Sequence, residues 1–193
     1  GLGCRGFVWE LGSGVSFRVR SPLDAWIVKE TWVDRAYDVA GTPVEDGWTV
    51  LDIGAGIGDF SVRAAKASPS GRVFAFEPAA DAFALLEENL AWNGARNVVA
   101  YREAIGAPGE TAATESLSSV RSRTVPAGSG GSLRPVPTAS LDEVFERLGL
   151  ASCDLLKMDV EGAEERILLG TSSETLLRVR HVVLEVHEEE EGG

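Results

Sequence analysis

The stretch VLDIGAGIGDFS at residues 50–61 decides the fold. An apolar run over residues 49–53 predicts a buried strand, glycines follow at every second position, and a helical pattern begins near Asp59. Glycines spaced in this way let the backbone turn tightly and let a ligand approach without interference from Cβ atoms. A strand, a glycine loop and a helix in this order predict a cofactor-binding turn, with a purely structural turn as the alternative.

The alternation of strands and helices continues outward from this stretch. The strands are nearly continuous apolar runs, which is typical of a sheet covered on both faces. Repeated βαβ units predict an α/β protein with a Rossmann-like, doubly wound and mostly parallel sheet, preceded by a β-hairpin and a helix. A loop is expected over residues 107–132, which are rich in Gly, Ser, Thr and Pro. The expected strands are 7–11, 15–19, 49–53, 72–77, 97–101, 133–138, 153–160 and 181–187, and the expected helices are 23–39, 59–67, 80–92, 141–148 and 162–169.

Composition excludes several classes of protein. The 193 residues carry 18 Lys and Arg against 30 Asp and Glu, a formal net charge of −12, which argues against nucleic acid or an anionic membrane as a partner. The two cysteines, Cys4 and Cys153, cannot build a disulfide framework or a four-ligand zinc site. No apolar run approaches the ~20 residues of a membrane span, and the first residues do not resemble a signal peptide. We therefore expect a cytoplasmic protein.

The residue after the glycines indicates the kind of ligand. A dinucleotide motif would place a third glycine at the position of Asp59, and an anionic side chain is a poor neighbour for a pyrophosphate. A carboxylate at Asp52 before the glycines suits a ligand with a cationic amino or sulfonium group instead. A nicotinamide dehydrogenase is the disfavoured alternative.

Acids also follow the next two expected strands. Glu77 lies 19 residues after Gly58, the spacing of an acid that accepts hydrogen bonds from both ribose hydroxyls. Its alternative is a helix-capping or solvated acid. Glu103 follows the third core strand, where it would lie beside an adenine ring, and a solvated acid is again the alternative.

The last two core strands carry the candidates for catalysis. Asp159 is expected at a strand tip, facing the crevice beyond the sheet. Lys157 is unusual inside an apolar strand, and it either pairs with a neighbouring acid or reaches out at an edge. Glu185 and His187 share one face of the fifth strand, and the imidazole suits a general base near neutrality. A solvated histidine is the alternative for His187.

Taken together, these motifs resemble the FkbM family of S-adenosylmethionine-dependent methyltransferases. The glycine stretch, the Phe76–Pro78 and Ser140–Asp142 segments and the run LKMDVEGAE at 156–164 carry the resemblance, and the segment Lys29–Trp32 with Tyr37 after it looks like an N-terminal helix of that family. The similarity covers about residues 14–187.

The resemblance implies a class I methyltransferase that transfers a methyl group from S-adenosylmethionine to a hydroxyl of a sugar, glycan or secondary metabolite. It implies that Asp159, Glu185 and His187 are the catalytic candidates. A divalent ion between Asp159 and Glu185 is an option that no ligand spacing demands. The implied cofactor-binding residues are Glu30, Tyr37, Asp52, Gly54, Ala55, Gly56, Gly58, Phe60, Glu77, Pro78, Glu103, Ala104 and Asp159.

The chain is expected to be a single domain over residues 1–193. Residues 1–45 form the hairpin and helix, 46–187 the cofactor-binding core, and 188–193 an acidic tail. Class I methyltransferases continue past the fifth strand into another helix and an antiparallel strand pair, and this sequence ends before them. Three explanations are open: the chain is truncated, the sequence omits residues, or the N-terminal hairpin covers the edge of the fifth strand; a bare edge would allow a dimer through that strand. A non-catalytic cofactor-binding module without a complete acceptor site is the second functional hypothesis.

Overall fold

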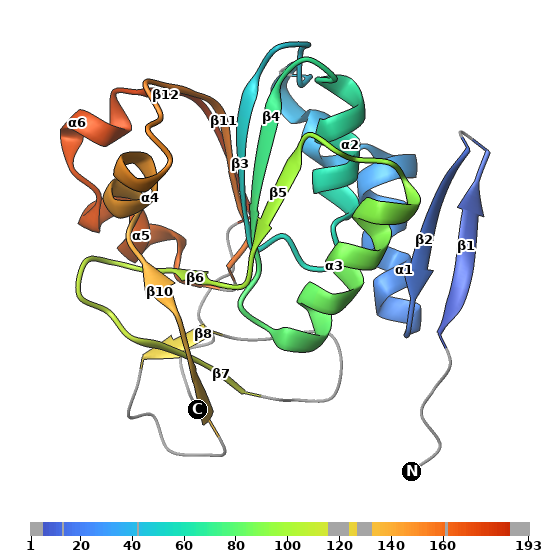
Figure 1. Ribbon diagram of the computed structural model, residues 1–193, viewed down its shortest axis with the longest axis horizontal. Coiled ribbons are helices and arrows are strands. Elements are labelled where there is room, and N and C mark those ends of the chain that lie inside the picture. The colour runs from blue at the N-terminus through green and yellow to red at the C-terminus, as the bar shows by residue number, and fades with distance from the viewer. Residues whose placement is uncertain are drawn as a thin grey trace.

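A parallel five-stranded sheet forms the centre of the computed structural model, which describes residues 6–12, 14–41, 43–115, 124–126, 133–160 and 162–185 (Figure 1). Its strand order is β12-β11-β3-β4-β5, so the chain runs outward from β3 to one edge and then returns to build the other half. This order places the topological switch point between β3 and β11, where ligands of such sheets bind. The strands are β3 (Thr49–Ile53), β4 (Arg72–Phe76), β5 (Val98–Tyr101), β11 (Cys153–Met158) and β12 (Val179–Leu184).

Helices cover both faces of the sheet and confirm the α/β class. Figure 1 shows α1, α2 and α3 on one side and α4, α5 and α6 on the other. Alternate residues of β3 enter separate cores, since Val50 packs in one cluster and Leu51 in the other. The helices are α1 (Pro22–Lys29), α2 (Asp59–Ala67), α3 (Ala80–Trp92), α4 (Leu141–Arg147), α5 (Glu164–Gly170) and α6 (Ser173–Leu176). None of the helices in the described ranges is long and apolar enough to cross a membrane.

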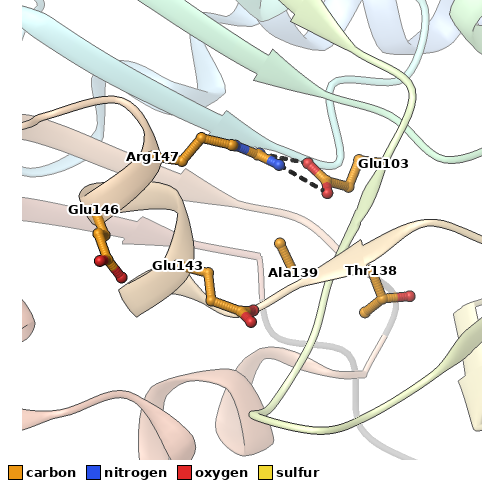
Figure 2. A pocket seen from close by; sticks show the side chains of 6 residues that line it. All are labelled: Glu103, Thr138, Ala139, Glu143, Glu146 and Arg147. Atoms are coloured by element: carbon orange, nitrogen blue, oxygen red, sulfur yellow. Dashed lines mark hydrogen bonds and ion pairs between the residues drawn. The ribbon is translucent and has the colours of Figure 1, made fainter.

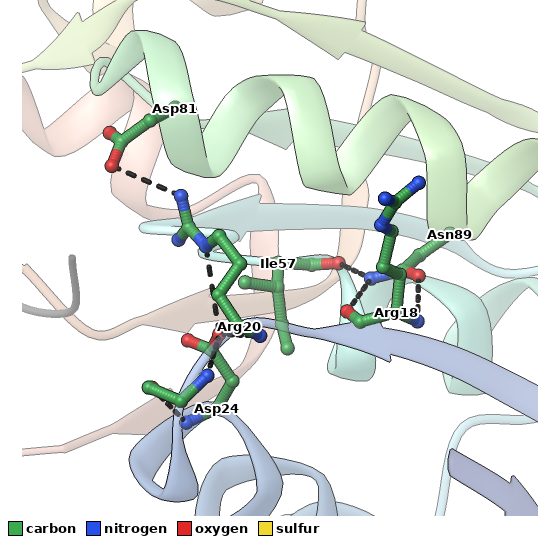
Figure 3. A network of polar contacts seen from close by, with 7 residues as sticks. Arg18, Arg20, Asp24, Ile57, Asp81 and Asn89 are labelled. Atoms are coloured by element: carbon green, nitrogen blue, oxygen red, sulfur yellow. Dashed lines mark hydrogen bonds and ion pairs between the residues drawn. The ribbon is translucent and has the colours of Figure 1, made fainter. Parts of the chain in front are cut away.

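The N-terminal hairpin packs on α3. Its strands β1 (Phe7–Leu11) and β2 (Val15–Val19) pair with each other, and the open side of β2 meets two asparagine side chains of α3. The Asn89 amide accepts from Arg18 N at 2.7 Å and donates to Arg18 O and Ile57 O at 3.3 and 2.8 Å, as Figure 3 shows. The Asn93 amide likewise accepts a hydrogen bond from Ser16 N and donates one to Ser16 O. Side-chain amides thus satisfy backbone groups of β2 that a further strand would otherwise pair.

An arginine ties the base of the hairpin to two helices. Arg20 lies between Asp24 of α1, at 3.6 Å, and Asp81 of α3, at 3.0 Å (Figure 3). The hairpin therefore lies at the α3 side of the molecule, far from β12 (Figure 1). The expectation that it covers the edge of the fifth strand is wrong, because β2 finds its partners on α3. Pairing of a second copy with β12 remains a prediction.

The first helix is shorter than the sequence predicts. α1 ends at Lys29, continues as a π-helix, η1 (Glu30–Asp34), and stops at Arg35, whose φ of 57° is left-handed. A 3-10 helix, η2 (Ala36–Gly41), follows. A left-handed residue is a common end of a helix, and here it redirects the chain towards the tip of the sheet.

Other differences lie at strand ends and in the expected loop. The two last core strands end at Met158 and Leu184, so Asp159 and Glu185 follow the strands directly, while His187 and the acidic tail lie outside the described residues. The Ser140 capping box is confirmed at the start of α4. Two strands lie within the expected loop, β7 (Ala112–Glu115) and β8 (Thr124–Pro126), and β7 lies between β8 and β9 (Leu133–Val136). The strand expected over residues 133–138 is divided into β9 and β10 (Thr138–Ala139), and β10 pairs with β6 (Ala104–Ile105).

Candidate functional site

The glycine loop joins β3 to α2 at the switch point of the sheet. Gly54, Gly56 and Gly58 all have positive φ, of 75°, 54° and 88°. A Cβ at Gly54 would lie 1.8 Å from the carbonyl oxygen of Asp159, so this glycine permits the ends of β3 and β11 to meet. A Cβ at Gly56 would meet nothing within 4 Å. The backbone at Gly56 is therefore open to a ligand, as the sequence predicts.

Glu77, at the tip of β4, holds the glycine loop in place. Its carboxylate accepts from Gly56 N of the loop at 2.9 Å and from Ala79 N at 2.8 Å. Burial raises the pKa of Glu77 to about 7, although both amide bonds favour the charged form. Each carboxylate oxygen can accept a second hydrogen bond, so the side chain retains acceptor capacity for hydroxyl groups. Its contact with a ribose remains a prediction.

Lys157 is the residue that sequence reasoning left undecided, and it lies at the centre of the site. Its buried ammonium donates to Gly54 O at 2.9 Å and lies 3.3 Å from Asp52 Oδ1 and 3.8 Å from Asp159 Oδ2. Burial disfavours this ammonium, but the neighbouring charges, Asp52 foremost, raise the pKa of Lys157 above its ordinary value. Of the two alternatives, pairing with an acid is therefore correct. Ser61 completes the cluster by donating to the other Asp52 oxygen at 2.5 Å.

Two aromatic rings cover the Lys157 ammonium. The rings of Tyr37 and Phe60 lie 5.4 and 5.9 Å from it and meet each other edge to face at 5.2 Å. Burial raises the pKa of Tyr37 well above its ordinary range, so its hydroxyl stays protonated and donates to Glu185 Oε2 at 3.1 Å. The structure thus brings together residues 37, 60, 157 and 185, which are far apart in the sequence.

Hydrogen bonds hold the η1 segment against the first residue of α2, Asp59. Thr31 donates its hydroxyl to the Asp59 carboxylate, and the Trp32 indole donates to Asp59 O at 3.1 Å. Burial raises the pKa of Asp59 to about 7. Glu30 is the first residue of η1, and its carbonyl accepts from Arg35 N–H at the left-handed turn. The sequence identifies Asp59 only as unfavourable to a pyrophosphate, because its Thr31 partner lies 28 residues away.

Glu103 lies at a pocket beside α4. Its carboxylate takes two bonds from the Arg147 guanidinium, at 3.1 and 2.5 Å (Figure 2), so it is an ion-paired acid rather than a solvated one. Ala104 follows it, buried in β6. Contact of either residue with an adenine remains a prediction. The pocket measures about 410 Å³ and is lined by Glu103, Thr138, Ala139, Glu143, Glu146 and Arg147.

Within the described residues, no group of three or more His, Cys, Asp or Glu side chains comes together as a metal would require. Asp159 and Glu185 follow the carboxyl ends of two neighbouring parallel strands, β11 and β12. His187, the third catalytic candidate, lies outside those residues.

The parallel sheet with its central switch point, the glycine loop after β3 and the acid after β4 define a class I methyltransferase fold. The chain belongs to the methyltransferase FkbM domain family, whose model matches residues 52–193. S-adenosylmethionine is therefore its cofactor. The site fits this group, since the backbone is open at Gly56 and the carboxylates of Asp52 and Asp159 suit a ligand with cationic groups.

Relatives support this assignment. Methyltransferase sdnD of Sordaria araneosa is 30% identical over 219 residues, which cover 90% of this chain and 79% of the relative. The 31-O-demethyl-FK506 methyltransferase FkbM of Streptomyces tacrolimicus is 29% identical, covering 84% of this chain and 74% of its own length. AMB antimetabolite synthetase AmbE of Pseudomonas aeruginosa is 29% identical over 86% of this chain, and the chain spans only 10% of that relative.

Solved methyltransferases show more distant likeness. A precorrin-6y C5,15-methyltransferase from Geobacter metallireducens has a TM-score of 0.46 at 23% identity, over 78% of this chain and 59% of that one. A SAM-dependent methyltransferase from Aquifex aeolicus has a TM-score of 0.47 at 15% identity, over 86% and 71%.

Proposed function

We propose that this domain transfers the methyl group of S-adenosylmethionine to a hydroxyl oxygen of a sugar, glycan or secondary metabolite. The observation that carries the proposal is the meeting of Asp52, Gly54 and Asp159 at the switch point, with the Tyr37–Glu185 pair beside them. Two related proteins have names that fit this chemistry: the FkbM protein above, and a hexuronic acid methyltransferase, AglP, of Haloferax volcanii, which is 27% identical over 91% of this chain and 72% of its own length.

The cofactor lies along the tips of β3, β4 and β5 in this proposal. Asp52 and the loop over residues 54–58 hold the methionyl end, with Tyr37 and Phe60 above it. Glu77 binds the ribose hydroxyls, and Glu103 and Ala104 flank the adenine. Asp159 is paired with Lys157, so it is better suited to orient a cationic group than to accept a proton.

The bound cofactor supplies an electrophilic methyl group, and the protein supplies position and a base. With the cofactor bound, the acceptor hydroxyl would receive this methyl group, and its proton would pass to a general base of this chain. We assign the base to Glu185, because its carboxylate directly follows β12, next to the end of β11 that carries Asp159, and is oriented by the Tyr37 hydroxyl at 3.1 Å. His187 is the alternative base.

The test is release of S-adenosylhomocysteine from S-adenosylmethionine with a panel of hexuronic acids, glycosides and macrolide alcohols. Loss of a general base lowers turnover by about 100-fold or more, so Glu185→Gln should do so while S-adenosylhomocysteine affinity stays within about two-fold. Glu174→Gln, an exposed acid on α6, is the matched control. Wild-type turnover in Glu185→Gln, with loss in His187→Gln, would move the base to His187. Binding without turnover on any acceptor would favour a non-catalytic module.

A further inference from the structure

Lys157 is a buried cation in a site for a cationic cofactor, and this requires an explanation. It lies in β11, an interior strand between β3 and β12, with only 3% of its surface exposed. Burying a charge is costly unless it is paired and hydrogen-bonded. The ammonium meets both conditions at the glycine loop itself, because its partners are Gly54 O, Asp52 and Asp159.

The contacts of Lys157 join the two strand ends that form the switch point. Asp52 lies at the end of β3 and Gly54 directly follows that strand, whereas Asp159 directly follows β11. Gly54 has no room for a Cβ against the Asp159 carbonyl, so the two ends are in direct contact there. The Lys157 hydrogen bond fixes the direction of the Gly54 carbonyl, and with it the orientation of the peptide groups that lead to Gly56.

The cluster also has a defined charge. Two carboxylates and one ammonium give Asp52, Lys157 and Asp159 a net charge of −1. S-adenosylmethionine carries a sulfonium, and its product S-adenosylhomocysteine carries a neutral thioether at the same position. A change of one charge in the cluster therefore acts on the two ligands differently, whereas a change of loop geometry acts on both alike.

We propose that Lys157 is a positioning residue with two effects: it fixes the Gly54 carbonyl for cofactor binding, and it sets the cluster charge that determines how strongly the site prefers S-adenosylmethionine to S-adenosylhomocysteine. Without its charge the cluster would hold the sulfonium more tightly relative to the product. This inference rests on the cofactor placement proposed above, but it needs no acceptor and no turnover.

The experiment is calorimetric titration of both ligands at pH 8.5 into wild type, Lys157→Met and Lys157→Gln. Unit charges about 10 Å apart in protein surroundings change affinity by about ten-fold. Both variants should therefore shift the affinity ratio about ten-fold towards S-adenosylmethionine. Affinity for S-adenosylhomocysteine should fall most in Lys157→Met and recover partly in Lys157→Gln, whose amide can still donate to Gly54 O. Lys66→Met, an exposed lysine of α2, is the control with the same charge change.

Two further variants, Asp52→Asn and its combination with Lys157→Met, test the proposal even if Lys157→Met alone does not fold. Asp52→Asn leaves a net charge of 0 and should shift the ratio about ten-fold towards S-adenosylhomocysteine. Adding Lys157→Met restores −1 and should return the ratio to within about two-fold of wild type. The proposal would be overturned if the ratio of the two ligand affinities were the same in Asp52→Asn as in the double variant. It would also be overturned if this ratio were unchanged from wild type in both single Lys157 variants. Failure of the wild type to bind either ligand would instead overturn the cofactor placement.

Discussion

Replacing Gly54 by alanine should destabilise the protein far more than the same replacement at Gly56. Both glycines have positive φ, so each substitution carries the left-handed cost of about 1–2 kcal/mol. Only at Gly54 does the new Cβ collide with backbone, 1.8 Å from Asp159 O and 2.8 Å from its carbonyl carbon. Relief of this clash separates the ends of β3 and β11.

The separation breaks two hydrogen bonds, from Asp159 N to Ile53 O at 3.0 Å and from the Lys157 ammonium to Gly54 O at 2.9 Å. A neutral bond contributes about 1 kcal/mol and a charged one about 2 kcal/mol. Gly54→Ala should therefore lower the free energy of unfolding by about 4–5 kcal/mol, and Gly56→Ala by about 1–2 kcal/mol.

Urea unfolding followed by circular dichroism measures the free energy of unfolding of both variants. Titration with S-adenosylhomocysteine then distinguishes a loss of stability from a loss of ligand binding. Gly56→Ala should fold well yet bind the ligand at least ten-fold more weakly, since its Cβ occupies the open side of the loop. Equal destabilisation by the two substitutions would refute the reasoning about the close approach at Gly54. Undiminished binding in Gly56→Ala would refute the claim that the ligand lies against Gly56.

Two further predictions concern buried polar side chains. Burial raises the pKa of Glu77 from 4.5 to about 7, so the folded state binds its proton more tightly than the unfolded state, and the stability from this group is lost as pH rises through 7. The free energy of unfolding of Glu77→Gln, relative to that of wild type, should therefore rise by about 3 kcal/mol from pH 5 to pH 8 in urea titrations. A difference that does not change with pH would contradict this. Asn89→Ala removes three hydrogen bonds, two that hold β2 on α3 and one to Ile57 O, and should cost about 3 kcal/mol. Glu88→Ala loses only an exposed ion pair with Arg18 and should cost under about 1 kcal/mol; similar losses in thermal unfolding would argue against the side-chain docking of the hairpin.

The order of elements in the core can be predicted from the sequence because its signals are local. Apolar runs, glycines and helix ends mark α2 and α3 at the residues where the structure places them. The capping box at Ser140 is a local signal of the same kind. The glycine loop is recognised for the same reason, since its strand, turn and helix are consecutive.

The remaining features depend on contacts between distant segments. Lys157 pairs with Asp52 only because the crossover places β11 beside β3, and no pattern near Lys157 shows this. The helix breaks at Arg35 although helical spacing continues through it, in a segment whose Thr31 hydroxyl bonds the distant Asp59. Strands β7 and β8 form in a stretch of turn-favouring residues because β7 pairs with both β8 and β9.

The most direct test of the account is calorimetric titration of the wild-type protein with S-adenosylhomocysteine and with NAD. An open glycine loop between Asp52 and Glu77, next to the Lys157 cluster, predicts one molecule of S-adenosylhomocysteine per chain, displaced by S-adenosylmethionine, and no binding of NAD. Binding of NAD without binding of either adenosyl ligand would contradict the assignment of the site.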